Sequence, residues 1–199
     1  MSAAVITRLE RMGRWEPDAQ GRMRLAALEL YLDPGFEQTT VSDIAERAGV
    51  TERTFFRYFA DKREVLFDAT GQMEHDVLAV LAATDPSLPA LDAAGEALAD
   101  GTAMLEERRE YARRRAAAIA ANASLQEREL LKLAQLGEAV TAALRERGVA
   151  EPEASIAAET AVAAFKVAFA AWIGDDAPGS LAERVRAVME RLRALAALS

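Results

Sequence analysis

Residues 40–59 have the sequence TVSDIAERAGVTERTFFRYF. Two short helix-forming segments flank Gly49, where the chain needs a sharp turn that glycine makes without a steric penalty. The apolar residues Ile44, Phe55 and Phe59 have the spacing of helix faces and are expected to meet beneath a preceding helix. The pattern predicts a helix-turn-helix.

The face of the second helix that points away from this core is predicted to carry polar, charged and aromatic groups. It consists of Glu52, Arg53, Phe56 and Arg57, with Thr54 and Tyr58 beside them. Such a face suits the major groove of DNA, because arginine bonds guanine with two donors and hydroxyl groups bond phosphates. The role of Glu52 stays open, since its carboxylate either accepts from cytosine N4 or repels phosphate.

Capping and helix-breaking residues set the boundaries of the N-terminal helices. Pro34 ends the first helix, and the hydroxyls of Thr40 and Thr51 are predicted N-caps of the two helices of the motif. Asp61 and Glu64 have the spacing of a capping box and are expected to open a long fourth helix. The four expected helices cover residues 18–32, 41–48, 51–59 and 62–83.

The remainder of the chain also has the periodicity of helices, and no segment alternates as a strand does. A Pro-rich linker at residues 84–89 precedes it. Further helices are expected near residues 88–106, 107–121, 123–147, 153–173 and 180–198. The sequence therefore predicts an all-α protein of about nine helices, with one domain over residues 1–66 and a helical bundle over residues 67–199.

Composition excludes several kinds of protein. The 199 residues contain no cysteine and one histidine, His75, so we expect no disulfide, no metal site and no cofactor. The N-terminus lacks the apolar core of a signal peptide. The most apolar stretch, residues 154–173, is interrupted by Glu159 and Lys166, so we expect no membrane span and a cytoplasmic location.

Charge is unevenly distributed along the chain. The net charge is −8, but residues 1–67 hold ten Lys and Arg against eleven Asp and Glu, and the remainder holds fourteen against twenty-one. Affinity for DNA depends on the local distribution of charge more than on the total. The acidic composition therefore neither supports nor excludes a nucleic-acid partner.

The segment from Arg22 to Leu66 resembles the DNA-binding domain of the tetracycline-repressor (TetR) family. The resemblance includes the run GFEQTTV at residues 35–41 and the run YFADK at residues 58–62. It implies a homodimeric, ligand-responsive transcription regulator and not an enzyme. Such a repressor would bind a palindromic operator in double-stranded DNA and be released by a small-molecule effector.

The resemblance also implies roles for individual residues of the motif. Thr40 and Ser42 would contact the edge of the groove from the first helix, and Thr51 and Arg57 would lie near the bases. The side chains that would face the bases are those of Glu52, Arg53 and Phe56. Phosphates would be held by Thr54, Tyr58 and Lys62, the last aided by the dipole at the start of the fourth helix.

The N-terminal arm has two open interpretations. Arg8, Arg11, Arg14 and Arg22 suit an arm that enters the minor groove, and they equally suit a solvated tail.

The two C-terminal helices are expected to form a dimer interface, as in the resembled family. Apolar residues at spacings of four and three favour a helix–helix seam, and small residues on the preceding helix permit close approach. The predicted interface comprises Ala161, Ala168, Leu181, Val185, Val188, Leu192 and Leu195. The alternative is that these residues close the core of the monomer.

An effector cavity is expected among the helices from residue 88 to residue 173. Its candidate lining is Met104, Leu105, Tyr111, Phe165, Phe169 and Trp172, each of which also suits a plain core position. Two other classes of protein stay open: a helical protein-interaction adaptor and a carboxylate-based enzyme. The adaptor would lack salt-dependent, sequence-selective binding to DNA.

Overall fold

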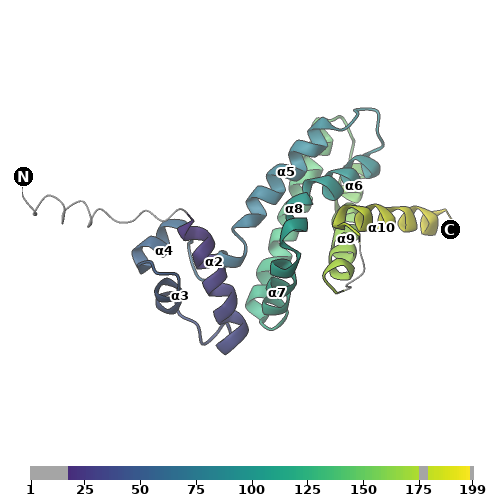
Figure 1. Cartoon of the computed structure of the whole chain (residues 1–199). Helices are drawn as coiled ribbons and strands as arrows, with labels where there is room; N and C mark the ends of the chain where they lie inside the picture. The colour runs from purple at the N-terminus through teal and green to yellow at the C-terminus, as the bar shows by residue number, and fades with distance from the viewer. Residues whose placement is uncertain (1–17, 175–178, 198–199) are drawn as a thin grey trace, which may run out of the picture. The chain divides into compact units, whose positions relative to one another are not determined.

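The computed structural model describes residues 18–174 and 179–197. Every regular element in these ranges is helical, which confirms the all-α prediction (Figure 1). The chain divides into two compact units, Met1–Val65 and Leu66–Ser199, and each is described by itself.

The described residues of the N-terminal unit form three short α-helices. They are α2 (Ala19–Leu30), α3 (Val41–Arg47) and α4 (Glu52–Tyr58). The first ends two residues earlier than expected and continues as a wider turn over Tyr31–Gly35, which includes Pro34. The turns after α2 and α3 use positive φ angles at Gly35 (118°) and Gly49 (67°). These are conformations that side chains with a Cβ rarely adopt.

The core of this unit joins one face of α2 to the helix-turn-helix. Met23, Leu28, Ile44 and Phe55 are each at most 1% exposed. On the rim of this core the Arg22 Nε donates to the Ala48 carbonyl at 3.0 Å, which ties α2 to the end of α3. The unit therefore holds its two motif helices at a fixed angle by apolar burial and by a side-chain bond to the turn.

The fourth helix begins later than the sequence predicted. Residues 59–68 form an extended residue, turns and a short 3-10 helix over Glu64–Leu66, and α5 covers Ala69–Ala83. The Asp61 carboxylate accepts from the amides of Arg63 (2.7 Å) and Glu64 (3.2 Å), so it stabilises a turn. The residues from Val65 to Phe67, in the 3-10 helix and the turn that follows it, are all buried.

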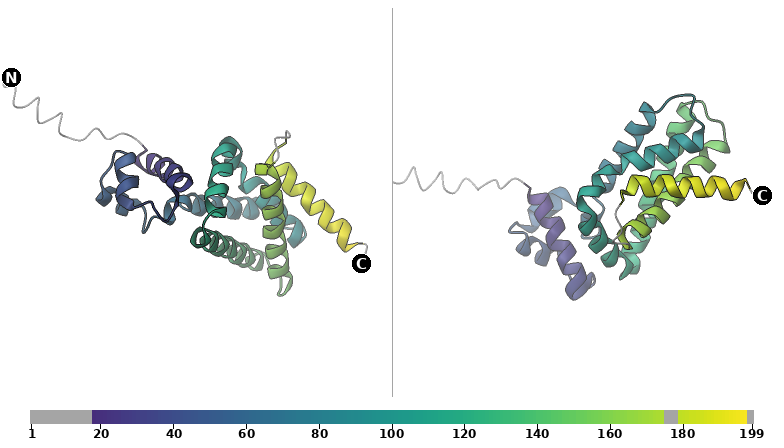
Figure 2. Two further views of the ribbon diagram at one scale, coloured as in Figure 1. Left: turned by 90° about the horizontal axis from the view of Figure 1, so that it is seen from below. Right: turned by 45° about the vertical axis from the view of Figure 1, so that its right-hand side comes forward.

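The C-terminal unit packs its helices around one apolar core (Figure 2). After α5 come α6 (Ala90–Gly101), a 3-10 segment (Ala103–Arg108) and α7 (Arg109–Ala120). The chain then forms α8 (Ala123–Glu146), α9 (Glu153–Gly174) and α10 (Leu181–Ala196). Helix α9 packs against α6, α8 and α10, so it is the central helix of this unit.

The expected helix over residues 88–106 is broken. Helix α6 ends at Gly101, and Thr102 is fully buried with its hydroxyl donating to the Leu98 carbonyl at 2.7 Å. A Cβ on Gly101 would lie 2.5 Å from the Cα of Val77, so α6 and α5 touch backbone to backbone at this point. The close crossing of two helices and the end of α6 therefore coincide.

Ion pairs hold α10 on α6. The Arg186 guanidinium lies 2.6 Å from Glu96 and 2.7 Å from Asp100. The hydrogen bonds that Arg186 donates to these two carboxylates, the one to Glu96 first, raise the pKa of Arg186 above its ordinary value. Arg193 pairs with Asp92 further along the same helix. These pairs fix the register of α10 along α6 more than they add stability, since each is partly exposed.

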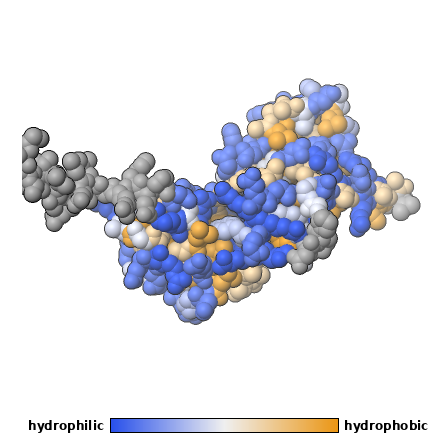
Figure 3. Space-filling view, in the orientation of Figure 1, coloured by the Kyte–Doolittle hydropathy of each residue, from blue (hydrophilic) through white to orange (hydrophobic). Residues whose placement is uncertain are grey.

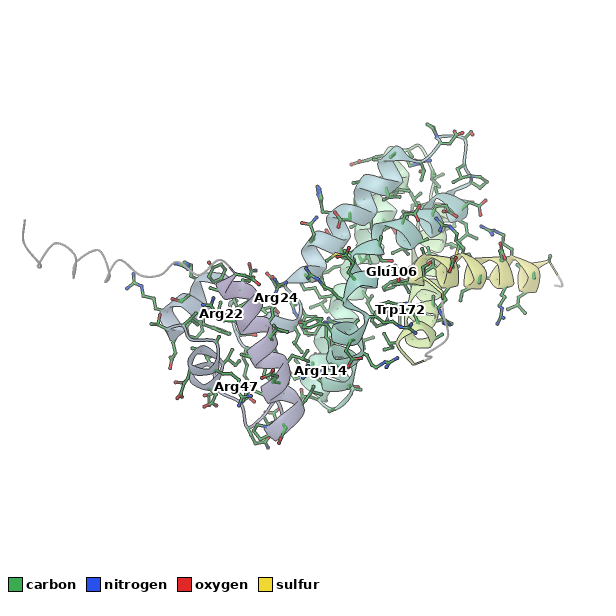
Figure 4. All side chains as sticks on the ribbon, viewed as in Figure 1. Arg22, Arg24, Arg47, Glu106, Arg114 and Trp172 are labelled. Atoms are coloured by element: carbon green, nitrogen blue, oxygen red, sulfur yellow. The ribbon has the colours of Figure 1, made fainter. Side chains whose placement is uncertain are left out.

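One segment holds both sides of the junction between α9 and α10. Arg109 and Arg113 donate from their Nε atoms to the carbonyls of Trp172 (3.0 Å) and Ile173 (2.7 Å), at the end of α9. A carboxylate oxygen of Glu106 accepts from the Leu181 amide at the start of α10. Figure 4 labels Glu106 and Trp172, both in the C-terminal helical unit. The positive charges of Arg109 and Arg113 lie at the negative C-terminal end of the α9 dipole, and the negative charge of Glu106 lies at the positive N-terminal end of the α10 dipole. Both interactions are favourable and stabilise the two helix ends.

Within residues 18–174 and 179–197, one helix, α9, is long and apolar enough to cross a membrane by length and composition alone. Its buried face carries Ala161, Phe165, Ala168 and Trp172, which belong to the core of the helical unit. On the face of the molecule seen in Figure 3, hydrophobic surface is divided into small patches among hydrophilic residues. The apolar composition of α9 is thus in part that of a core helix.

Candidate nucleic-acid interface

Helix α4 presents the predicted groove-facing residues to solvent. Glu52, Arg53, Phe56 and Arg57 are all exposed, and they lie on one side of the helix because Phe56 follows Glu52 by four and Arg53 by three positions, and Arg57 follows Arg53 by four. Phe56 is the most unusual of them, with 55% of its surface exposed. The face therefore combines two guanidinium groups, one carboxylate and one aromatic ring.

Aromatic rings support this face from below. Phe55 is completely buried and packs on Phe59, with ring centroids 5.3 Å apart. The exposed ring of Phe56 meets Phe55 edge to face, at 5.4 Å and 84°. Phe55 and Phe59 are thus core residues, as the sequence predicted. Together they form the buried aromatic pair against which the Phe56 ring packs.

The hydroxyl groups of α4 are partly engaged within the helix. The Thr51 Oγ1 accepts from the Thr54 amide at 3.1 Å, which confirms Thr51 as the N-cap, and it lies 3.0 Å from the Thr54 hydroxyl. Arg57 lies over the ring of Tyr58, with its guanidinium carbon 4.9 Å from the ring centroid and one donor 3.2 Å from the phenol oxygen. Arg57 and Tyr58 therefore form a pair at the C-terminal end of α4.

Helix α3 begins with the predicted cap. Thr40 and Asp43 form a full capping box, in which the Asp43 carboxylate accepts from the Thr40 amide (2.8 Å) and hydroxyl (2.7 Å). These bonds, the one from the side chain first, lower the pKa of Asp43. Ser42, the second residue of α3, is exposed. Of the two groove-edge candidates on α3, Ser42 is thus the one whose side chain is outside the cap.

Lys62 lies in a different setting from the one expected. Its Nζ donates to the carbonyls of Phe36 (2.8 Å) and Thr39 (2.9 Å) and stands 4.2 Å from the Phe36 ring centroid. The Lys62 carbonyl accepts from the buried Tyr31 hydroxyl, whose pKa is raised by burial. Because α5 begins at Ala69, the expected aid from a helix dipole at Lys62 was wrong.

We therefore expect Lys62→Met to act mainly on stability. Loss of two bonds to loop carbonyls should lower the free energy of unfolding of the N-terminal unit by about 1–3 kcal/mol. A phosphate contact would instead leave stability unchanged and reduce the slope of log affinity against log salt by about one. Thermal unfolding and DNA titrations at several salt concentrations measure the two effects. Arg63→Met, at an exposed neighbouring cation, is the matched control.

The basic arm is only partly described. Arg8, Arg11 and Arg14 lie outside the described residues. Arg22 was wrongly assigned to the arm, because it lies within α2 and bonds the Ala48 carbonyl.

The expected dimer seam is corrected by burial. Four of its members are at 0% exposure, since their side chains face the core of their own helical unit: Ala161, Ala168, Leu181 and Val185. Val188 and Leu192 are half-buried, and Leu195 is 69% exposed. The spacing of four and three in α10 thus marks, for its buried members, packing on α6 and α9 within one chain.

A second apolar stripe lies on the outer face of α9, and sequence reasoning missed it. Ile156 and Val167 are 61% and 60% exposed. Ala163 and Ala170 are exposed along the same line, and Thr160 is half-buried. These five residues, which we call the α9 stripe, repeat at spacings of four and three. The signal in the sequence is that α9 is apolar around most of its circumference, which one buried face does not require.

The candidate effector-pocket residues lie in two groups. On α9, Phe165 and Trp172 are buried and Phe169 is half-buried, with ring centroids 5.8 and 5.9 Å apart along the row. The other three candidates are half-buried in the 3-10 segment and the start of α7: Met104, Leu105 and Tyr111. Arg109 links the two groups, with its guanidinium carbon 5.3 Å from the Trp172 ring centroid.

Part of the chain, mostly in the N-terminal unit, matches a known family model. Residues 25–69 match the family model described as bacterial regulatory proteins, tetR family. The transcriptional regulator TcmR of Streptomyces glaucescens is 49% identical over 55 residues, which are 28% of this chain and 24% of TcmR. This chain thus matches about a quarter of the length of that relative. The residues that match the family model, 25–69, include the whole helix-turn-helix.

Solved structures resemble the chain over most of its length. A TetR-family protein from Syntrophomonas wolfei str. Goettingen superposes with a TM-score of 0.63 at 19% identity, over 90% of this chain and 95% of that one. SmeT, the repressor of the Stenotrophomonas maltophilia multidrug efflux pump SmeDEF, gives a TM-score of 0.57 at 18% identity, over 88% and 89%. At these identities the likeness concerns the fold, and it extends to the C-terminal helical unit.

Proposed function

We propose that the N-terminal unit, in which the match to the tetR family model begins at residue 25, is a DNA-binding domain, and that the whole protein is a ligand-responsive transcriptional repressor. It binds a palindromic operator as a homodimer and leaves it when a small-molecule effector binds the helical unit. Repression is the simpler outcome, because a dimer on a promoter blocks polymerase without further contacts.

The observation that carries this proposal is the exposed face of α4 on a rigid base. Arg53 and Arg57 are exposed beside Phe56, and the buried Phe55 fixes the helix beneath them. A helix of this kind fits the major groove, where guanidinium groups bond guanine and phosphates. The acidic Glu52 on the same face adds selectivity, since it favours cytosine N4 and disfavours contact with phosphate.

The test is sequence-selective binding to duplex DNA. A random-sequence selection with the full chain identifies the preferred duplex, and fluorescence anisotropy then measures its affinity at several salt concentrations. We expect the preferred duplex to be bound about 10³-fold or more tightly than scrambled DNA, with affinity falling as salt rises. Equal affinity for both duplexes, or no binding to either, would favour the helical adaptor.

Replacing Arg53 with alanine should weaken the preferred duplex by about tenfold or more and relax base preference at one position in each half-site. The reason is the loss of a two-donor contact that other bases do not accept equally. Arg145→Ala, which removes an exposed charge from the C-terminal end of α8, is the matched control and should leave affinity nearly unchanged. Titrations against duplexes substituted at each position measure both effects.

The α9 stripe is the proposed dimer interface. It offers two large apolar residues, Ile156 and Val167, that are about three-fifths exposed, with small residues between them. Small residues allow two helices to approach closely, and a stripe that meets its own copy makes a closed two-fold dimer. Leu195 of α10, the exposed member of the interface predicted from the sequence, is proposed to belong to the same dimer interface.

The segment from Glu106 to Arg115 is the proposed link between effector and DNA-binding domain. Its N-terminal part holds the ends of α9 and α10 through Glu106, Arg109 and Arg113. Further along α7, Arg115 donates to the carbonyl of Leu66, the first residue of the helical unit, and forms a 2.7 Å ion pair with Glu129. An effector that moves α7 thus acts on both contacts. A compound that raises the melting temperature but leaves operator affinity unchanged would contradict this link.

A further inference from the structure

Phe56 is an apolar ring in the middle of a charged surface. It is 55% exposed, although phenylalanine loses free energy when its ring is left in water. Its neighbours on the surface of α4 are Arg53, three positions before it, and Glu52, four positions before it. Arg57 follows directly. A single exposed aromatic ring is common on protein surfaces. A ring at the centre of a candidate binding face, however, is placed to make an apolar contact with whatever binds there.

The orientation of the Phe56 ring is set from inside the domain. It meets the fully buried Phe55 edge to face, and Phe55 packs in turn on the buried Phe59. Phe56 thus keeps contact with the core while more than half of its surface is exposed. A side chain supported in this way loses little conformational entropy when it binds, so it suits a contact that must be made at one place.

Phenylalanine has no hydrogen-bonding group, so it distinguishes bases only by an apolar contact. In the major groove the apolar group that differs between bases is the 5-methyl group of thymine. We infer that Phe56 contacts the methyl group of a thymine in each half-site of the operator. The inference rests on the proposed function and adds one specific base to it.

The position of this thymine follows from the helix. Arg53 and Phe56 are neighbours on the α4 surface, with Cβ atoms about 5–6 Å apart at this spacing. Successive bases of one strand are separated by about 3.4 Å along the duplex. The thymine therefore lies within one or two base steps of the guanine that Arg53 contacts.

Duplex DNA is favoured over a protein as the occupant of this surface. Two exposed arginines border the ring, and Tyr58 and Thr51 add hydroxyl groups at the two ends of the helix. In contact with DNA, the arginines and hydroxyl groups would bond phosphates while the single ring contacts one methyl group. Protein interfaces instead have a larger apolar centre with charged residues at its rim.

The test replaces thymine by deoxyuridine, which removes the methyl group and keeps every hydrogen-bonding group of the base pair. The probe is the duplex from the random-sequence selection, substituted at one symmetry-related pair of thymines at a time. At one such pair, deoxyuridine should weaken binding by about fourfold per half-site, the effect of one methyl group no longer buried. Thymines elsewhere in the half-site serve as internal controls.

The protein variant completes the cycle. Phe56→Ala should bind the thymine duplex more weakly and should bind the thymine and deoxyuridine duplexes equally. Phe56→Leu, which keeps an apolar side chain, should retain part of the difference. Because the ring is more than half exposed, both variants are expected to fold, and circular dichroism with thermal unfolding checks this.

Three outcomes would overturn the inference. Insensitivity of the wild-type protein to every deoxyuridine would exclude a methyl contact, and an equal loss in Phe56→Ala would assign that contact to another residue. Unchanged affinity of Phe56→Ala for both duplexes would make Phe56 a candidate protein contact. In all three the selective binding of DNA persists, so the proposed repressor function stands. That function fails only if no sequence is selected.

Discussion

Substituting Val167 with glutamate should convert the protein from a dimer to a monomer and lower operator affinity by about 10²–10³-fold. Val167 is 60% exposed in the middle of the α9 stripe. A carboxylate there would be buried against its own copy across a two-fold axis, where neither charge has a partner. A monomer engages one half-site only and loses the gain from binding two linked sites. Sedimentation velocity and anisotropy with the selected duplex measure the two effects.

The same change at another exposed apolar residue is the control. Leu130 is 59% exposed on α8, outside the stripe, so Leu130→Glu should leave the dimer intact. Dimers that persist in Val167→Glu and dissociate in Leu130→Glu would place the interface on α8 and contradict the proposal. Far-ultraviolet circular dichroism of both variants shows whether the monomer has kept its helices.

Replacing Gly101 with alanine should lower the free energy of unfolding of the helical unit by about 1–3 kcal/mol, the usual cost of overpacking. The added Cβ would lie 2.5 Å from the Cα and 2.8 Å from the backbone nitrogen of Val77. Backbone atoms cannot move aside as a side chain does, so α5 and α6 would separate at their crossing. Urea unfolding followed by circular dichroism measures the loss.

Gly95 in the same helix provides a matched control. A Cβ there would meet the end of the Met189 side chain, with the Cε at 2.9 Å, and a methionine can adopt another rotamer. Alanine also stabilises a helix by about 1 kcal/mol relative to glycine. We therefore expect Gly95→Ala to be close to neutral. Equal losses in the two variants would show that the distance to the Val77 backbone is not what matters at Gly101.

Most of the N-terminal unit was predictable because its determinants are local. The caps at Thr40 and Thr51 and the turn at Gly49 each depend on residues within a few positions. The cap at Ser180, with Glu183 completing its box, follows the same rule in α10. Hydrogen bonds between near neighbours form wherever the spacing is right, so the sequence alone indicates them.

The sequence by itself also determined that the protein is all-α, and that one face of α4 would be charged and exposed around a single aromatic ring. Helical periodicity and amphipathic spacing are properties of the chain that packing does not reverse here. The helical spacing predicts Phe55 and Phe59 in the core and Phe56 on the surface. The structure agrees, since Phe55 and Phe59 are buried and Phe56 is exposed.

Only the tertiary structure decided which partner each apolar or charged group meets. A seam such as Leu181 and Val185 suits a second copy as well as the same chain, and here it packs within the chain while Val167 stays exposed. Lys62 was predicted to contact phosphate because it is a cation beside the motif. Its ammonium group instead donates to two backbone carbonyls more than twenty positions away in the sequence. Periodicity fixes which face of a helix is apolar; what covers that face depends on contacts distant in sequence, which spacing does not encode.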